Sequence, residues 1–172
     1  MLNNIKNILF LTLFIHLFLY GSNNSDQYVV LVSFDGFRYD YAQRVDTPNF
    51  DYIEKNGIKA KSLKPVFPSF TFPNHYSIAT GCYADKHGII GNEFTNSLGR
   101  YSYKNKETVQ DGKWYGAEPI WVTAEKNDIK SATYFWVGSE AKIGGYYPTY
   151  YKYYESGTSP YFKVNQVIEW LK

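Results

Sequence analysis

The apolar positions of this chain fall into short runs separated by proline and glycine, and their order predicts an α/β fold. Residues 28–34 are nearly all apolar, rich in β-branched side chains and too few for a core helix. Such a run is typical of a strand buried on both faces of a parallel sheet. Residues 59–67 predict a second strand, ended by Pro65 and Pro68, and residues 131–136 predict another.

Helices are predicted between and after these strands because start and stop signals bound them. These signals predict helices in the four segments 47–57, 71–81, 119–127 and 159–172. In the last helix the side chains expected to point inward are Phe162, Val164, Val167, Ile168 and Leu171. Residues 93–116 predict a hairpin or inserted loop, and residues 144–157 predict a tyrosine-rich loop. Because a helix normally leads back into the sheet, the last helix predicts that the chain is the front part of a larger domain.

Composition narrows the class of protein. The 172 residues suffice for one domain with a core, and 18 Tyr, 12 Phe and 4 Trp supply large side chains for it. A net charge of +2 argues against a nucleic-acid scaffold, which would show a basic stripe. The single cysteine, Cys82, excludes an internal disulfide.

The first residues predict a secretory signal peptide. Lys6 precedes an apolar stretch over residues 8–20, and the small residues Gly21 and Ser22 follow it. That stretch is shorter than the roughly 20 residues of a membrane span. We therefore expect a signal over residues 1–22 and a mature domain over 23–172, without a stable membrane span. An uncleaved anchor is the alternative, and both place the domain outside the cytoplasm, whether secreted, periplasmic or at the cell surface.

Two side chains are candidates for chemistry. Thr71 lies just ahead of Pro73 at a predicted helix start, where free N–H groups and the helix dipole favour anions. Asp35 follows the run 28–34, and ligands of open α/β sheets bind at the carboxyl ends of strands. Each residue alone also has a simpler explanation, Thr71 as a helix cap and Asp35 as a turn residue.

Several motifs, taken in order, resemble the nucleotide pyrophosphatase/phosphodiesterase family of the alkaline phosphatase superfamily. The first two are Val32 to Arg38, which resembles a metal-ligand motif, and Phe67 to Tyr76, which resembles a nucleophile motif. Shorter matches lie at residues 47–50, 80–81, 87–92, 118–121, 135–136 and 147–148. The resemblance covers about residues 28–172. It implies an alkaline-phosphatase-like α/β core, with a mostly parallel sheet flanked by helices, of which this chain is the N-terminal part.

The resemblance implies a metal-dependent hydrolase of phosphodiester and pyrophosphate bonds in nucleotides. Family members usually use two zinc ions, and the resemblance implies that Asp35 and Thr71 bind one of them. Thr71 would then attack phosphorus as an alkoxide, which metal coordination can generate. Asn92 would donate a hydrogen bond to a phosphate oxygen, helped by the backbone N–H of Phe72. Without the family, Asn92 after Gly91 is better explained as closing a turn.

Three aromatic residues match positions that contact the nucleotide base in the family. Phe72 and Tyr154 would stack on the base, and Trp136 would line its pocket. Phe72 is also explained as a core residue that shares a helix face with Tyr76. Tyr154 lies in a run of tyrosines, so its alignment can shift by one or two positions. The resemblance makes His75 structural, and His87 likewise, rather than metal ligands.

Two departures from the family pattern affect the expected activity. Phe70 stands where many relatives carry a lysine before the nucleophile, which leaves substrate preference open. The remaining Asp and His zinc ligands of the family have no match in residues 28–172. Since zinc normally takes four ligands, we expect the chain alone to bind no stable two-zinc site and to hydrolyse little. The alternatives are a lysophospholipid or choline-phosphate phosphodiesterase, and an inactive fragment or binding module.

Overall fold

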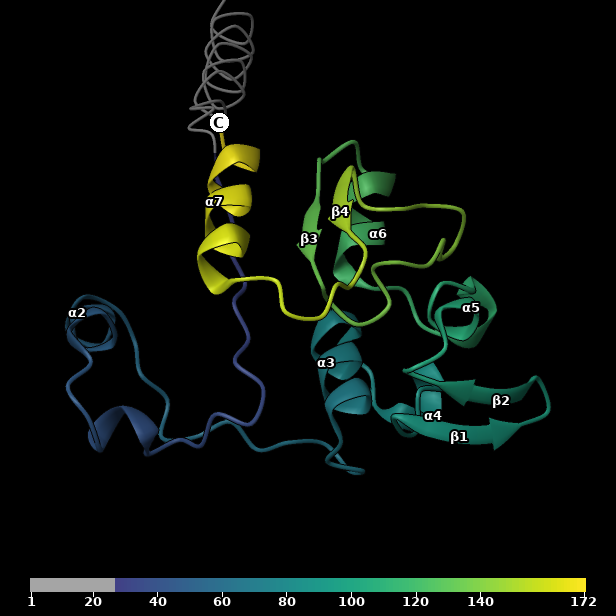
Figure 1. Cartoon of the computed structure of the whole chain (residues 1–172), viewed down its shortest axis with the longest axis horizontal. Coiled ribbons are helices and arrows are strands. Elements are labelled where there is room, and N and C mark those ends of the chain that lie inside the picture. The colour runs from purple at the N-terminus through teal and green to yellow at the C-terminus, as the bar shows by residue number, and fades with distance from the viewer. Residues whose placement is uncertain (1–26) are drawn as a thin grey trace, which may run out of the picture. The chain divides into compact units, whose positions relative to one another are not determined.

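The computed structural model describes residues 27–172, which are coloured in Figure 1. They belong to two units, which divide between Phe37 and Arg38. The expected signal peptide over residues 1–22 and the domain boundary at residue 23 lie outside the described residues. In the first unit the backbone turns at Asp35-Gly36, where Gly36 has a φ of 66° that favours glycine.

The predicted strand over residues 28–34 is wrong for this structure. These residues have no regular secondary structure, and their large apolar side chains are exposed, by 91% at Val29 and 54% at Leu31. A strand exists only where its N–H and C=O groups pair with a neighbour. Within residues 27–172, no ladder includes this run. The second predicted strand, over residues 59–67, is wrong for the same reason.

The predicted helices of the second unit are confirmed; the first three end at the expected signals, and the last ends at Trp170 rather than at Lys172. They are α2 (Pro48–Asn56), α3 (Thr71–Thr80), α6 (Ile120–Lys126) and α7 (Pro160–Trp170). Helix α3 ends at Gly81, whose φ of 65° is left-handed and whose N–H donates to the Ser77 carbonyl. Short helices not predicted from the sequence are α4 (Ala84–His87), α5 (Lys106–Val109) and the 3₁₀ turns η1 (Tyr41–Gln43) and η2 (Gly112–Trp114).

Two small sheets accompany the helices (Figure 1). The predicted hairpin is confirmed as β1 (Glu93–Asn96) antiparallel to β2 (Gly99–Ser102). The predicted strand at 131–136 is confirmed in a shorter form as β3 (Ala132–Tyr134). It pairs in parallel with β4 (Tyr150–Lys152), so the segment expected to be a tyrosine-rich loop contains a strand. The mixed α/β class is confirmed.

The parallel pair is held at its start by one carboxylate. Glu125, on α6, accepts hydrogen bonds from the backbone N–H groups of Ser131 and Thr149 at 2.8 Å each, and from both hydroxyls. Burial alone would raise the pKa of Glu125, but these hydrogen bonds outweigh it and lower the pKa. Glu125 therefore joins α6 to the residues that precede both strands.

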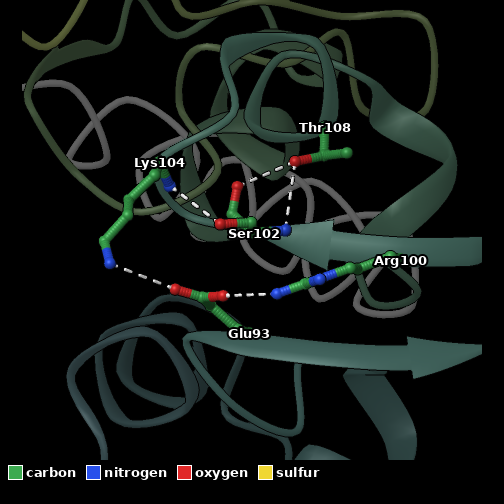
Figure 2. A network of polar contacts seen from close by, with 5 residues as sticks. All are labelled: Glu93, Arg100, Ser102, Lys104 and Thr108. Atoms are coloured by element: carbon green, nitrogen blue, oxygen red, sulfur yellow. Dashed lines mark hydrogen bonds and ion pairs between the residues drawn. The ribbon is translucent and has the colours of Figure 1, made fainter.

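The hairpin is closed at its surface by charged and polar side chains. Figure 2 shows Glu93 on β1 between Arg100 of β2 and Lys104, with N···O distances of 3.2 and 3.4 Å. The Arg100 hydrogen bond lowers the pKa of Glu93. Thr108 of α5 donates to the Ser102 carbonyl at 2.8 Å, which attaches that helix to the end of β2 (Figure 2).

The core of the second unit is aromatic. Its buried residues come from α3, α6, the hairpin region and residues 137–143, and include Tyr76, Ile89, Tyr101, Trp114, Tyr115, Trp121 and Val122. The Tyr115 hydroxyl donates to the Val109 carbonyl at 2.9 Å, so it accepts from the Tyr101 hydroxyl 3.0 Å away. Buried phenols thus have partners inside the core.

Helix α7 does not contribute the core residues expected of it. Phe162, Val164, Ile168 and Leu171 are exposed by 39% or more, and Val167 is half-buried. The helix contacts β3, and its Trp170 packs against Tyr134 and Tyr150. Among the described residues, α7 packs through the face that carries Trp170. The prediction that its apolar side chains point into a core is therefore wrong here. Among residues 27–172, no helix has the length and apolar character needed to cross a membrane.

Candidate functional site

Thr71 is the first residue of α3 and is half-buried. Phe70 before it is extended, with φ −95° and ψ 162°, and its side chain makes no capping hydrogen bond. Pro73 is buried in the first turn, where its lack of an N–H costs no helical bond. The start of α3 is therefore held by two side chains outside the N-cap position.

Asn92 is one of these side chains. Its Oδ1 accepts a hydrogen bond from the backbone N–H of Phe72 at 3.0 Å, across 20 residues of sequence. The N–H that we expected to help hold a phosphate therefore donates to Asn92. Because Oδ1 is engaged on the helix, the amide nitrogen of Asn92 is the end that remains for donating to a ligand. Asn92 and the residue after Thr71 are thus brought together, and the phosphate-binding role expected of both stays a prediction.

Asn74 is the second, and the sequence reasoning missed it. Its Oδ1 accepts from the Val66 N–H at 2.8 Å, and its Nδ2 donates to the Phe70 carbonyl at 2.8 Å and the Pro68 carbonyl at 3.3 Å. An asparagine in the first turn of a helix competes for nearby backbone groups, which is the signal that could have identified it. The backbone of residues 66–70, just before Thr71, therefore binds the Asn74 amide at three points.

His75 lies on α3 one turn after Thr71, and Trp136, which follows β3, contacts it. The His75 Nδ1 is 2.8 Å from the Thr71 carbonyl, which can only accept, so Nδ1 carries the proton. The indole N–H of Trp136 donates to the His75 carbonyl at 3.0 Å, and the two rings meet edge to face at 5.8 Å. Trp136 is therefore fixed to the helix that begins at Thr71.

Phe72 and Tyr154 have different surroundings. The Phe72 ring is half-buried against Tyr101 and Tyr103, with centroids 6.2 and 5.7 Å away. Tyr154 is 61% exposed, and its ring meets Phe135, the neighbour of Trp136, at 5.2 Å. Of the two, only Tyr154 offers most of its surface to a ligand. The roles of both in binding a base stay predictions.

Glu140 is a further residue that the sequence reasoning missed. It is buried, and its Oε1 accepts from the Tyr154 N–H at 2.7 Å, while its Oε2 accepts from Gln110 at 3.2 Å. Ser139, the residue before it, donates to the Trp136 carbonyl at 2.8 Å. The loop after Trp136 therefore holds the backbone at Tyr154.

His87 is structural in its contacts. It is fully buried, its Nδ1 accepts from the Ile89 N–H at 3.2 Å, and its Nε2 lies 2.8 Å from the Ser77 hydroxyl. Burial lowers the pKa of this imidazole, which keeps it neutral. Both ring nitrogens have protein partners, so His87 is not free to bind a metal.

Asp35 belongs to the first unit and Thr71 to the second, so the pairing of their oxygens stays a prediction. A carboxylate and a hydroxyl oxygen suit zinc as donors, but zinc normally takes four ligands. Residues 27–172 contain no group of three His, Cys, Asp or Glu side chains that could hold a metal ion. The two-zinc site implied by the resemblance therefore stays a prediction.

Comparison with known proteins identifies the family. The sequence model for type I phosphodiesterase/nucleotide pyrophosphatase matches residues 29–172. The chain belongs to this family.

Relatives and solved structures agree with this membership. Venom phosphodiesterase of Naja atra is 42% identical over 146 residues, which are 83% of this chain and 18% of that protein. Human ectonucleotide pyrophosphatase/phosphodiesterase family member 5 is 40% identical over 147 residues, 84% of this chain and 31% of that protein. A structure of murine ectonucleotide pyrophosphatase/phosphodiesterase 5, an inactive Thr-to-Ala variant in complex with AMP, matches with a TM-score of 0.80 and 37% identity.

The match to the murine structure covers 86% of this chain and 40% of that protein. At this identity the likeness confirms the alkaline-phosphatase-like α/β fold expected of the family. The chain spans less than half the length of each of these three relatives.

Proposed function

We propose that this chain carries the nucleophile of a secreted hydrolase that cleaves phosphodiester and pyrophosphate bonds in nucleotides, with Thr71 as the attacking residue. The observation that carries the proposal is the start of α3, where the Asn92 amide binds the N–H of the residue after Thr71 at 3.0 Å. The inactive Thr-to-Ala variant of the murine relative, solved in complex with AMP, supports a threonine role and a nucleotide ligand. The venom and ectoenzyme names of relatives support secretion.

The chemistry at Thr71 is a displacement at phosphorus. The bond from Oγ to phosphorus forms while the phosphorus–oxygen bond to the leaving group breaks, and the hydroxyl proton is released to solvent. Water then cleaves the phosphothreonine and regenerates the hydroxyl. The amide nitrogen of Asn92 donates to a non-bridging phosphate oxygen, and the exposed ring of Tyr154 stacks on the base, with Trp136 lining the base pocket.

A direct test uses the protein encoded by the complete reading frame that contains these residues. Thymidine 5′-monophosphate p-nitrophenyl ester is the substrate, and release of nitrophenol is measured. We expect Thr71→Ala to lower kcat by at least about 10³-fold, and Thr71→Ser to retain part of the activity, because only the hydroxyl is needed. Thr95→Ala, at an exposed position of β1, is the control and should leave kcat unchanged. Full activity of Thr71→Ala would refute the nucleophile.

The substrate class is tested on the same protein with glycerophosphocholine and lysophosphatidylcholine beside the nucleotide ester. Nucleotide preference is expected because Tyr154 and Trp136 offer aromatic faces to a base. Aromatic faces also suit quaternary ammonium groups, so a higher kcat/KM for the choline esters would favour the alternative phosphodiesterase.

The zinc part of the proposal gives Asp35 and Thr71 as the donors that this chain contributes. For the 172-residue chain itself, we expect little zinc in the purified protein and little turnover, since two donors do not fill a four-ligand shell. Metal analysis of the protein after zinc loading measures this. Two tightly bound zinc ions per chain, with turnover, would contradict the expectation.

A further inference from the structure

We propose that Asn74 is a positioning residue for Thr71, acting through the backbone of residues 66–70. The inference rests on the proposed function, since it assigns Asn74 an effect on the reaction at Thr71. Asn74 touches neither substrate nor the reacting atoms in this proposal. It determines how the chain enters α3 and therefore where the Thr71 hydroxyl points.

The contacts of Asn74 use three of the four hydrogen bonds that an asparagine side chain can make. An asparagine amide has one oxygen and two N–H groups. Here the oxygen accepts from Val66 N–H at 2.8 Å, and the nitrogen donates to the carbonyls of Phe70 at 2.8 Å and Pro68 at 3.3 Å. The three partners alternate along the segment that leads to Thr71. One side chain therefore fixes the last five residues before the nucleophile.

This fixing acts on the backbone at the N-cap position, whose own side chain makes no hydrogen bond. The N-cap position is held by Phe70, whose side chain cannot accept a hydrogen bond, and Pro73 offers no N–H. The Phe70 carbonyl instead receives both the backbone N–H of Asn74 at 3.2 Å and its side-chain nitrogen at 2.8 Å. The Phe70 N–H donates to the Pro68 carbonyl at 2.9 Å, so the extended conformation of Phe70 is held from both sides.

Thr71 is held after its own position by other residues. Its carbonyl lies 2.8 Å from His75 Nδ1, and the next N–H is bound by Asn92 at 3.0 Å. Loss of Asn74 would therefore release only the side of Thr71 that faces the loop. A shift of about 1 Å in a reacting group costs on the order of 10²-fold in rate. We expect the loss in kcat rather than in KM.

Two substitutions separate positioning from simple stability. Asn74→Ala removes all three hydrogen bonds. Asn74→Asp keeps an oxygen for the Val66 N–H but sets a carboxylate against the Phe70 and Pro68 carbonyls. A carboxylate in the first turn is favourable to the helix dipole, so this variant changes the loop without weakening α3.

Asn127→Ala is the matched control, because the Asn127 side chain also donates to the carbonyl four residues earlier, that of Thr123, at 2.8 Å. It lies at the end of α6 and is not part of the proposed machinery. We expect Asn127→Ala to lower the stability of the protein without changing the position of Thr71.

The experiment measures kcat and KM for the nitrophenyl thymidylate ester, together with the unfolding midpoint, for the protein of the complete reading frame. We expect both Asn74 variants to lower kcat per folded molecule by about 30- to 100-fold, with KM changed less than about 3-fold, and Asn127→Ala to change neither. If Asn74→Ala fails to fold, Asn74→Asp alone decides. Unchanged kcat per folded molecule in Asn74→Asp would overturn the inference.

Failure of the proposed function gives a different result. In that case wild-type protein has no turnover, or Thr71→Ala is as active as wild type, and the inference falls with it. If instead Thr71→Ala is inactive while the Asn74 variants keep wild-type kcat, only the positioning role is refuted.

Discussion

Residues 71–156 and residues 27–70 are similarly rich in apolar side chains but bury them very differently. In the first region Tyr76, Tyr101 and Val122 are fully buried and belong to one cluster. In the second, Val29 and Ile58 are exposed by 91% and 99%. Since burial of apolar surface is the main favourable term in folding, the first region holds most of the stability of the described residues.

This difference means that the backbone around Thr71 is held by packed neighbours, whereas the apolar residues before Asp35 are exposed. The start of α3 is fixed by side chains that come from α3 itself and from the residue before β1. The large apolar side chains of residues 28–34, before Asp35, are exposed by 54% or more. Substitutions should therefore lower the free energy of unfolding strongly in residues 71–156 and weakly in residues 27–70. The following experiments measure that contrast.

The largest effect is expected at Gly138. A Cβ there would lie 2.9 Å from a ring carbon of Tyr76 and 3.2 Å from the ring of Tyr115, and its φ is +85°. We expect Gly138→Ala to lower the free energy of unfolding by about 3 kcal/mol. Gly145→Ala is the control, with φ +90° and open space around it, and should cost only about 1 kcal/mol. Equal losses in urea unfolding would show that no steric clash contributes at Gly138.

The second largest effect is expected at the buried phenols of Tyr115 and Tyr101. Tyr115→Phe removes the donor to Val109 and the acceptor of the Tyr101 hydroxyl, so we expect a loss of about 2 kcal/mol. Tyr101→Phe leaves the Val109 bond intact and should cost about 1 kcal/mol or less. A larger loss for Tyr101→Phe would contradict the assigned direction of these bonds.

The dependence of unfolding on alkaline pH tests the same two phenols, Tyr101 and Tyr115. Burial raises the pKa values of Tyr101 and Tyr115 above the usual 10.0. Their contribution to stability is therefore complete below pH 10 and is lost as pH rises above it, because the unfolded chain ionises first. The unfolding midpoint should fall steeply above pH 10 in wild type and less steeply in Tyr101→Phe. Equal slopes would exclude Tyr101 from this linkage.

Glu125 should have a smaller effect. Glu125→Gln removes the charge that strengthens the bonds to Ser131 and Thr149, and we expect a loss of about 1 to 1.5 kcal/mol. Because the pKa of Glu125 is lowered from its usual 4.5, its contribution is present above that value and is lost as pH falls through the folded-state pKa. The variant should lose less stability on acidification than wild type. Glu93→Gln, in the exposed network of Figure 2, is the control and should leave the midpoint unchanged.

Local signals in the sequence were sufficient for the four longer helices but not for the short ones. Gly57, Gly81 and Asn127 ended helices where the sequence placed the ends, because a C-terminal signal acts through its own backbone. The run 28–34 has the right composition for a strand, but a strand needs partners that composition does not supply. β4 was missed because its sequence, Tyr150-Tyr151-Lys152, lies in a run of tyrosines in which apolar and polar residues do not alternate.

The candidate site was also predictable only in part, because local motifs indicate some of its residues and not others. Thr71 at the start of α3 and Asn92 beside Phe72 follow from motifs in the sequence. Asn74 and Glu140 act through backbone groups of other segments, at Val66 and Tyr154, and such contacts become visible only once the loops are folded. Sequence patterns thus indicated candidate residues such as Thr71 more readily than the side chains that hold the backbone around them.

The smallest effect is expected at Val29, and it tests the contrast most directly. Val29→Thr changes a methyl group to a hydroxyl at a position 91% exposed, so the free energy of unfolding should change by less than about 0.5 kcal/mol. Val122→Thr makes the same change at a fully buried position of α6 and should cost about 2 kcal/mol, because the core would then hold a poorly paired hydroxyl. Urea unfolding of both variants gives the difference. If Val29→Thr were as costly as Val122→Thr, residues 28–34 would be packed in the folded protein, and stability would not be concentrated in residues 71–156.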